Sequence, residues 1–266
     1  MTDELLFDRQ DGVAWITFNR PSVKNALTKA MCAELVSIVG RLRYDRETRV
    51  IVFRSNGADF TAGADLKDIS KGLPTDAAER GADVAAMARS IAWPIFLAMH
   101  DLRQPIVASV RGHVIGAGVQ VVLSADLTVA SETSRFLLPQ VKLGHPVDHG
   151  ESYYLPRKIG LARTMQMTLL AETWSAAEAD KYNLVNWVVP DSDLEKKTEQ
   201  VVLRLAKGAS VALYETKALV RDSARRTVAE QYAEEVHALE RCAATEDFPE
   251  AINAFIEKRT PNYKGR

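Results

Sequence analysis

The chain has 266 residues, enough for one large domain or for a domain with an appendage. It carries 34 Lys and Arg against 35 Asp and Glu, and this balance disfavours a protein whose main task is to hold nucleic acid. The two cysteines, Cys32 and Cys242, lie far apart and predict free thiols in a reducing compartment. The start lacks an apolar secretory segment, and no stretch approaches about 18 uninterrupted apolar residues. We therefore expect a cytoplasmic protein with no nucleic-acid or membrane partner.

The first third of the chain is predicted to form a hairpin, a helix and a buried strand. Residues 5–9 and 13–18 flank an Asp-Gly turn and are typical of hairpin arms. Thr28 is expected to cap an amphipathic helix, and residues 50–53 form the short apolar run of a buried strand. Small residues and glycines in the segment 55–70 would let backbone amides approach a ligand closely.

The middle of the chain alternates helix and strand patterns. Residues 77–99 have helical spacing with a kink expected at Pro94, and Trp93 is interpreted as a core residue. A strand is expected at 104–110. The glycine-rich turn 116–118 then opens an apolar helix, whose N-terminus presents unpaired N–H groups. With a further strand at 127–130, this alternation predicts an α/β architecture with largely parallel strands.

The last third is predicted to be mostly helical. Residues 152–170 have a helical pattern, Ser175 begins a capping box, and 185–189 is a strand. We divide the chain into a core, residues 1–200, and a C-terminal helical region, residues 201–266. The helices predicted after the last strand are, approximately, 193–207, 210–224, 227–245 and 248–257.

Four stretches together resemble the crotonase superfamily, also called the enoyl-CoA hydratase/isomerase family. They are Arg20-Pro21 with Asn25-Ala26-Leu27, residues 60–67, residues 104–118 with Asp126, and residues 139–160. Weaker matches continue to the region of Phe255 to Arg259, so that the resemblance covers nearly the whole chain. As a set, these motifs are specific for the fold and for acyl-CoA use, and they are not specific for the reaction.

The resemblance implies a crotonase-like spiral of repeated ββα units, followed by a helical region that builds a homotrimer, with trimers pairing into hexamers. It implies an acyl-CoA thioester as substrate, with coenzyme A as part of that substrate and no separate cofactor. The thioester oxygen would receive two backbone N–H bonds, from Ala64 and Ala117. Lys24 and Lys67 could meet the CoA phosphates, and the expected CoA-binding residues are Lys24, Ala26, Ala62, Asp65, Leu66 and Lys67.

The chemistry of such a site follows from charge. Removing a proton next to a thioester, or adding a nucleophile to it, builds negative charge on the carbonyl oxygen. Fixed amide donors in a dry site stabilise that charge, and each donor is worth on the order of 3 kcal/mol. The N-terminus of the helix that begins at Ala117 adds its dipole.

Two positions depart from the hydratases of this family, in which two glutamates share one water as base and acid. Matched onto this chain, these positions are Gln120 and Gln140. Glutamine orients water or an acyl group, but it cannot exchange a proton at neutral pH. The resemblance therefore disfavours hydration by paired glutamates, and it equally disfavours an isomerase that uses the second glutamate alone.

Asp148 is the remaining acid, at a position where most members of the family carry glycine. Two subgroups carry Asp there: dienoyl-CoA isomerases, which use it as a base, and 4-chlorobenzoyl-CoA dehalogenases, which use it as a nucleophile. Neither is fully reproduced. His145 and His149 beside Asp148 suit general acid–base work. The alternatives are that Asp148 caps the following helix, that the histidines are structural, and that Glu151 is a first-turn helix charge.

The spacing of these histidines and acids matches no zinc motif, and we expect no metal. The sequence thus predicts an acyl-CoA isomerase, lyase or hydrolase that stabilises a thioester enolate or oxyanion and uses Asp148. The alternative is a catalytically silent acyl-CoA-binding homologue.

Overall fold

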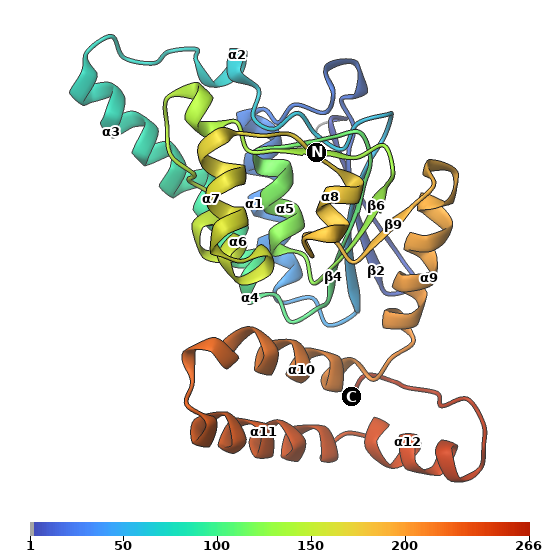
Figure 1. Ribbon diagram of the computed structural model, residues 1–266. Helices are drawn as coiled ribbons and strands as arrows, with labels where there is room; N and C mark the ends of the chain where they lie inside the picture. The colour runs from blue at the N-terminus through green and yellow to red at the C-terminus, as the bar shows by residue number, and fades with distance from the viewer. Residues whose placement is uncertain (1–2) are drawn as a thin grey trace.

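A six-stranded sheet is the framework of the computed structural model, which describes residues 3–266 (Figure 1). Its order is β1-β2-β3-β4-β6-β9; β1 and β2 form the predicted antiparallel hairpin, and the other neighbours are parallel. The mixed α/β fold with mainly parallel strands is confirmed. The strands are β1 (Leu5–Gln10), β2 (Val13–Phe18), β3 (Val50–Ser55), β4 (Ile106–Val110), β6 (Leu127–Ser131) and β9 (Trp187–Val189).

A second, three-stranded sheet contains β5 (His113–Ile115), β7 (Arg135–Leu137) and β8 (Trp174–Ser175). The chain passes from a strand of the large sheet to a strand of the small sheet and then to a helix, as in β4–β5–α5, where α5 is Ala117–Ser124. This repetition is the expected ββα spiral. The small sheet was not predicted, because strands of two or three residues carry no readable alternation.

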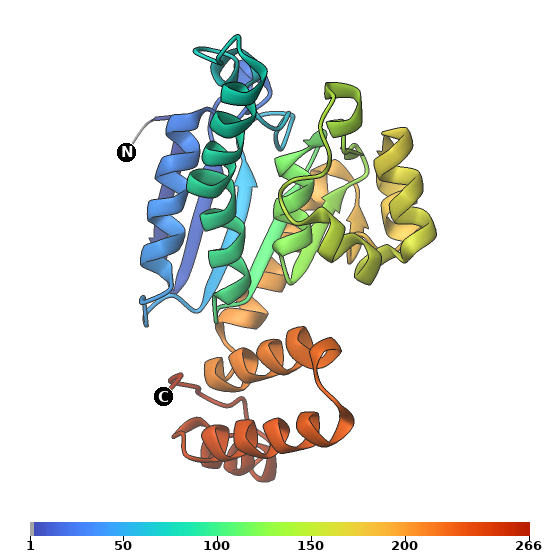
Figure 2. The same ribbon diagram turned by 90° about the vertical axis from the view of Figure 1, so that its left-hand side faces the viewer.

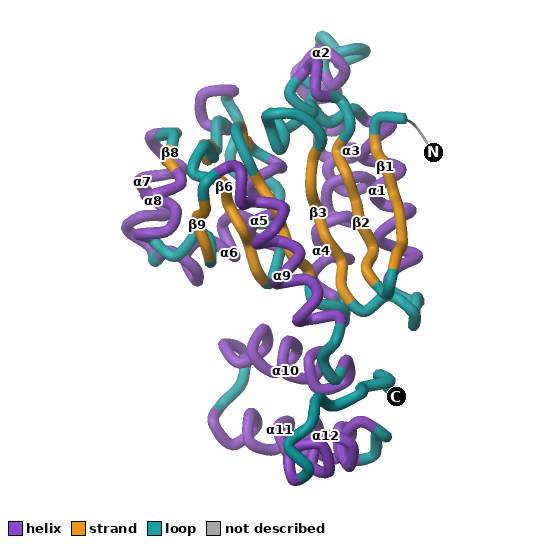
Figure 3. Tube along the Cα trace, turned by 90° about the vertical axis from the view of Figure 1, so that its right-hand side faces the viewer, coloured by secondary structure: helices purple, strands orange, loops and turns teal. Residues whose placement is uncertain are grey.

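Helices cover both faces of the large sheet (Figure 3). α9 (Leu194–Ala206) packs on one face, where its apolar residues join valines of β2, β3, β4 and β6. α1 (Lys29–Leu42) and α4 (Trp93–Asp101) pack on the other face, with the larger apolar cluster. Thr28 caps α1 as predicted, since its hydroxyl accepts a hydrogen bond from Met31 N–H at 3.2 Å.

α3 (Ala77–Met87) joins α4 through a π-helical turn at Ala88–Ala92, directly before Pro94, where a kink was expected. In the part of the chain that the structure describes, Ala77–Asp101 is the one helical stretch that length and composition would let cross a membrane. A single such helix is a weak indicator, and the expectation of no membrane partner stays a prediction. Trp93 is 59% exposed, so its interpretation as a core residue is wrong.

Shorter helices surround the expected site. Residues 152–170, predicted to be helical, form two helices that break at Gly160, and Ser175 forms its capping box. Short 3-10 turns occupy Pro21–Val23, Gln140–Leu143, Asp191–Asp193 and Ser223–Arg225. The remaining helices of this part are α2 (Leu66–Ile69), α6 (Glu151–Ile159), α7 (Leu161–Leu170) and α8 (Ala176–Lys181).

The last three helices lie apart from the sheets (Figure 2). They are α10 (Ser210–Asp222), α11 (Val228–Ala243) and α12 (Asp247–Ile256), close to the predicted ranges. The division proposed at residue 200 falls inside α9, whose contact with the sheet continues to Ala206. Asp126 fastens α10 to the core, because its carboxylate lies 2.8 Å from both Lys217 Nζ and Arg221 Nη2.

Candidate functional site

The loop at residues 60–65 lies against the small sheet at the amino end of α5. Thr61 N–H donates to His113 O at 2.9 Å, and Ile115 N–H donates to Thr61 O at 3.0 Å. Through these bonds Thr61 pairs with Val114 as an isolated parallel β-bridge. The loop and the strand that leads into α5 are therefore fixed relative to each other by backbone bonds.

Two glycines permit this close approach. A Cβ on Gly63 would lie 2.8 Å from Ile115 O, and one on Gly118 would lie 2.6 Å from the Thr61 methyl carbon. Gly63 also has φ +83°, a conformation that favours glycine. Any larger residue at either position would push the loop away from α5.

The amides of Ala64 and Ala117 are placed next to this contact. Ala64 pairs with Leu27 as an isolated parallel bridge, made by Leu27 N–H to Gly63 O and Asp65 N–H to Leu27 O. In such a bridge the central residue's own N–H points away from the partner strand. Ala117 is the first residue of α5, where N–H groups lack intrahelical partners. The residues before them, Gly63 and Gly116, are in contact, since a Cβ on Gly63 would lie 3.8 Å from Gly116 Cα. The structure thus places Ala64 and Ala117 near each other, and the binding of a thioester oxygen by their N–H groups stays a prediction.

The residues predicted to bind CoA lie in the 60–65 loop or in segments next to it, and we call this group of residues the rim. Leu66 and Lys67, at the start of α2, are exposed, and Ala26 and Ala62 are half-buried. Asp65 has a structural position instead: it caps α2 by accepting from Lys67 and Asp68 N–H, and it pairs with Arg20 at 3.1 Å. The Arg20 guanidinium lowers the pKa of Asp65. Asp65 therefore shapes the rim rather than offering a free carboxylate to a ligand.

Lys24 is held at this rim by a short chain of polar contacts. Its Nζ lies 3.4 Å from His113 Nε2, and the opposite ring nitrogen of His113, Nδ1, lies 2.6 Å from Asp59 Oδ1. The Lys24 carbonyl accepts from Ala62 N–H at 2.8 Å. His113 and Asp59, which the sequence reasoning missed, therefore orient a lysine predicted to meet phosphate.

The side chains of the two glutamines are buried. Gln120 is 0% exposed and Gln140 is 3% exposed. Gln120 Nε2 donates to Ser124 Oγ at 3.1 Å, and Gln140 Nε2 donates to Glu151 Oε1 at 2.9 Å. Each glutamine Oε1 is buried with no hydrogen-bond partner among the described residues. Each side-chain amide is thus held by the hydrogen bond that its nitrogen donates, and its oxygen remains available as an acceptor.

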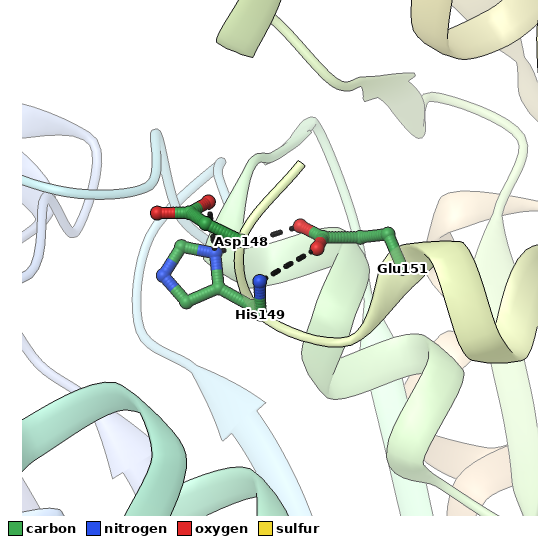
Figure 4. A group of neighbouring side chains, drawn as sticks. All are labelled: Asp148, His149 and Glu151. Carbon is green, nitrogen blue, oxygen red and sulfur yellow. Dashed lines mark hydrogen bonds and ion pairs between the residues drawn. The ribbon is translucent and has the colours of Figure 1, made fainter. Parts of the chain in front are cut away.

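Asp148, His149 and Glu151 form a compact cluster (Figure 4). His149 Nδ1 lies 3.1 Å from Asp148 Oδ1 and 3.5 Å from Glu151 Oε1, and Glu151 Oε2 accepts from His149 N–H at 2.8 Å. Glu151 stands in the first turn of α6, as expected, but it is 0% exposed and bridges His149 to Gln140. The sequence offered one signal for this role of Glu151: it is a carboxylate directly after Gly150, next to the loop that contains Asp148.

The cluster shifts the proton affinity of its members. Burial alone would raise the pKa of Asp148, but the His149 side chain, with smaller contributions from His145 and Gln140, lowers it below its usual value. Burial alone would lower the pKa of His149, but Asp148 and Glu151 raise it to about 9. At neutral pH the loop therefore carries an imidazolium between two carboxylates.

Two alternatives from the sequence can now be compared with the structure. No side chain caps α6, whose N-cap is Gly150, so Asp148 is not a helix cap. His145 is exposed: its Nδ1 lies 3.0 Å from Pro146 O and 4.0 Å from Asp148 Oδ2. It stands at the edge of the cluster and not inside it.

The cluster also has the composition of a cation site, because Asp148, His149 and Glu151 each offer one ligand atom and these atoms lie within 4.8 Å of one another. The expectation that the protein uses no metal accordingly stays a prediction.

Comparison with known proteins decides the family. The family model described as enoyl-CoA hydratase/isomerase matches residues 8–266. The chain belongs to the enoyl-CoA hydratase/isomerase family.

Among its relatives is the 2,3-dehydroadipyl-CoA hydratase of Escherichia coli strain K12, 32% identical over 263 residues, covering 99% of each chain. Another is the trans-2-decenoyl-[acyl-carrier-protein] isomerase of Streptococcus mutans, 30% identical, covering 99% of this chain and 98% of that one. The crystal structure of an enoyl-CoA hydratase from Bacillus anthracis matches with TM-score 0.90 and 29% identity, over 99% of this chain and 100% of that one. The crotonase fold and membership of an acyl-CoA-processing family are therefore confirmed.

The close approach at Gly63 can be tested against a matched glycine. Gly72 also has a positive φ, +80°, but a Cβ there would meet nothing within 4 Å. We expect Gly72→Ala to lower the free energy of unfolding by about 1 kcal/mol and Gly63→Ala by roughly 3 kcal/mol, since the latter adds a clash with a backbone oxygen. Urea unfolding measures both, and equal losses would show that the loop does not depend on this contact.

The His149 cluster predicts a pH dependence of stability. Because the folded-state pKa of His149 is raised to about 9, its contribution is complete below the unfolded value near 6.5 and is lost as pH rises through 9. The unfolding free energy of the native protein should therefore fall between pH 6.5 and 9. In His149→Gln this part of the decrease should be absent. The variant His237→Gln, on the exposed side of α11, serves as the control.

Proposed function

We propose that the protein is an acyl-CoA isomerase that moves a proton through a thioester enolate, with Asp148 as the base. The observation that carries this proposal is Asp148 itself: a half-exposed carboxylate whose Oδ1 is ion-paired with His149 Nδ1 at 3.1 Å, in a site whose other two family acid positions are glutamines. A proton shift between two carbons needs one base that takes the proton and returns it. A single carboxylate is sufficient for that task.

In the proposed step, Asp148 takes a proton from a carbon of the acyl group. The electron pair moves through the conjugated system to the thioester oxygen, which accepts hydrogen bonds from Ala64 and Ala117 N–H. The proton then returns from Asp148 to the other end of the system, and the carbonyl is restored. No atoms are gained or lost, so the proposal includes no redox or group-carrying cofactor, and coenzyme A enters only as part of the substrate.

Hydration is disfavoured by the available acids. Adding water needs a base for the water and an acid for the carbon, and neither Gln120 nor Gln140 transfers protons at neutral pH. His149 is the other candidate acid, but its pKa is raised to about 9 and its Nδ1 faces two carboxylates. These contacts favour keeping the proton on the ring.

The lowered pKa of Asp148 makes it a weak base, so more of the barrier must be removed at the other end of the enolate. Two amide donors at the thioester oxygen, each worth on the order of 3 kcal/mol, together with the dipole of α5 supply that stabilisation. The rigid attachment of Thr61 to β5 supports this assignment, because a preorganised site needs no rearrangement during the reaction.

We further propose that the CoA moiety lies along the rim formed by Lys24, Ala26, Ala62, Leu66 and Lys67. Lys24 and Lys67 supply the positive charge for its phosphates, and exposed Leu66 supplies an apolar contact. A relative named as a hydratase and another named as an isomerase are about equally similar to this chain, so likeness alone does not choose the reaction.

A homotrimer, or a hexamer made of two trimers, is proposed as the assembly. The C-terminal helices expose a band of large apolar side chains, which in soluble proteins marks an interface. Light scattering should give a mass three or six times 29.4 kDa, and a mass of 29.4 kDa would reject the proposal. The band contains Val228, Tyr232, Val236, Leu239, Phe255 and Ile256.

The alternative is a catalytically silent acyl-CoA-binding homologue, and one observation favours it: both positions that carry glutamate in the hydratases of the family are glutamines here. Such a protein would keep the amide pair and bind thioesters without transferring protons.

The variant Asp148→Asn separates the two functions. We expect it to lower kcat at least 100-fold for the reactive thioester, because general-base catalysis contributes about 10²–10⁴-fold. The readout is exchange of α-hydrogens in D₂O by NMR, across enoyl-, dienoyl-, cyclic β-keto- and aroyl-CoA thioesters, together with the appearance of the isomerised product.

Asp8→Asn, on the exposed part of β1, serves as the matched control and should leave exchange unchanged. Full activity in Asp148→Asn would remove Asp148 from the mechanism. Calorimetric binding of thioesters with no exchange by the native protein would establish the silent homologue instead.

A further inference from the structure

A cavity of about 870 Å³ opens between α4, α6 and α10, beside the catalytic cluster. His149 and Gly150 of the catalytic loop form part of its wall. His149 therefore faces two environments: its Nδ1 lies in the acid cluster, and its ring borders the cavity. Neither the cavity nor its lining was read from the sequence.

The inner wall is built mainly of rings that hold one another in place. Phe96 meets His149 edge to face, with centroids 5.4 Å apart and planes at 76°. His100 and Tyr154 are 6.1 Å apart, and Tyr153 and Tyr154 are 5.2 Å apart at 84°. Aromatic pairs prefer such edge-to-face geometry, and a wall of interlocked rings changes shape little.

The cavity is within reach of an acyl group whose thioester oxygen sits at Ala64 and Ala117. Gln120 follows Ala117 by three residues of α5, a rise of roughly 4.5 Å along the helix axis. Gln120 Nε2 lies 3.5 Å from the place a Cβ would take on Gly150. Gly150 is part of the cavity wall, so an acyl group need extend only a few carbons from its thioester to arrive there.

We propose that this cavity receives the acyl group, and that the substrate is a CoA thioester of a ring-bearing acid with an oxygen substituent on the ring. The inference rests on the proposed function. A volume of about 870 Å³ far exceeds the need of a four-carbon chain, and the rings of Phe96, Tyr153 and Tyr154 give part of the wall apolar faces that suit a ring, while charged side chains line much of the rest.

The oxygen substituent is inferred from the polar groups of the wall. His100 Nδ1 and Tyr154 Oη lie 2.8 Å apart, which orients both groups. Burial, followed by the charge of Arg221, lowers the pKa of His100, so the ring is neutral at neutral pH. A neutral imidazole paired with a phenol offers a donor or an acceptor without the desolvation cost of a buried charge.

Charges at the mouth favour the same kind of ligand. The exposed or half-exposed cations Arg43 and Arg225 border the cavity with Arg103, against the acids Asp101 and Asp222. This excess of positive charge favours a ligand group with partial negative charge, such as a hydroxyl or keto oxygen, and disfavours a cationic group.

Calorimetry on the native protein tests this directly and does not depend on turnover. Cyclohexanecarbonyl-CoA and benzoyl-CoA should bind at least tenfold more tightly than butyryl-CoA. 4-Hydroxybenzoyl-CoA should bind more tightly than benzoyl-CoA, and Tyr154→Phe should lower only the affinity for the hydroxylated ring, by threefold to tenfold, the range expected for one hydrogen bond.

A filling variant tests the location. Ala218, exposed on α10, lines the cavity, so Ala218→Trp should lower affinity for ring-bearing thioesters at least tenfold and leave butyryl-CoA within twofold. Thr216→Trp, at an exposed position of α10 outside the cavity lining, is the matched control and should bind every thioester as the native protein does.

Butyryl-CoA binding as tightly as the ring-bearing thioesters, or equal losses for all ligands in Ala218→Trp, would overturn the proposal, and so would a lack of binding by every thioester. These outcomes are distinct from a failure of the proposed reaction: an unaltered rate in Asp148→Asn would remove the base and leave a measured preference for rings intact.

Discussion

The contact between the 60–65 loop and the amino end of α5 is the constraint on which the site depends. Two backbone segments approach so closely that Gly63 and Gly118 leave no room for a Cβ. Backbone bonds from Thr61 to β5 hold the contact from behind. The outcome is that Ala64 and Ala117, on segments far apart in the sequence, follow two glycines, Gly63 and Gly116, whose backbones lie side by side. Side chains could be exchanged around this contact, but the spacing of its two backbones could not.

The second constraint is electrostatic. His149 joins two carboxylates where an otherwise exposed loop becomes half-buried, and its side chain is only 19% exposed. A buried carboxylate without a partner would be protonated or would destabilise the fold, and the imidazolium removes that cost for Asp148. The same pairing lowers the pKa of Asp148, which sets its strength as a base. Stability and reactivity are therefore coupled through one ring, and neither can be changed there without the other.

The sequence predicted those parts of the fold that local pattern determines. Helix caps such as Thr28, the strands of the large sheet and the C-terminal helices were all readable, because periodicity and capping act over a few residues. The two amides were placed only through the resemblance to a family. The strands of the small sheet, the burial of Glu151, the partnership of His113 with Asp59 and the cavity beside His149 were not predicted. Each depends on contacts between residues 11 or more positions apart, and no local pattern records which side chains those contacts bring together.

The polar groups of the site fall into hydrogen-bond donors and hydrogen-bond acceptors. On one side are two N–H donors, at Ala64 and Ala117. On the other are open acceptors: Oε1 of Gln120 and Oε1 of Gln140. A thioester oxygen satisfies the donors, but nothing in a plain acyl chain satisfies the acceptors. Because buried acceptors need donors, water or a hydroxyl must meet the glutamines. A donor that hydrogen-bonds to these amide oxygens loses no proton to them, because glutamine does not accept a proton at neutral pH. The replacement of the family's two acids by glutamines thus leaves two buried acceptors that can bind a donor without exchanging a proton with it.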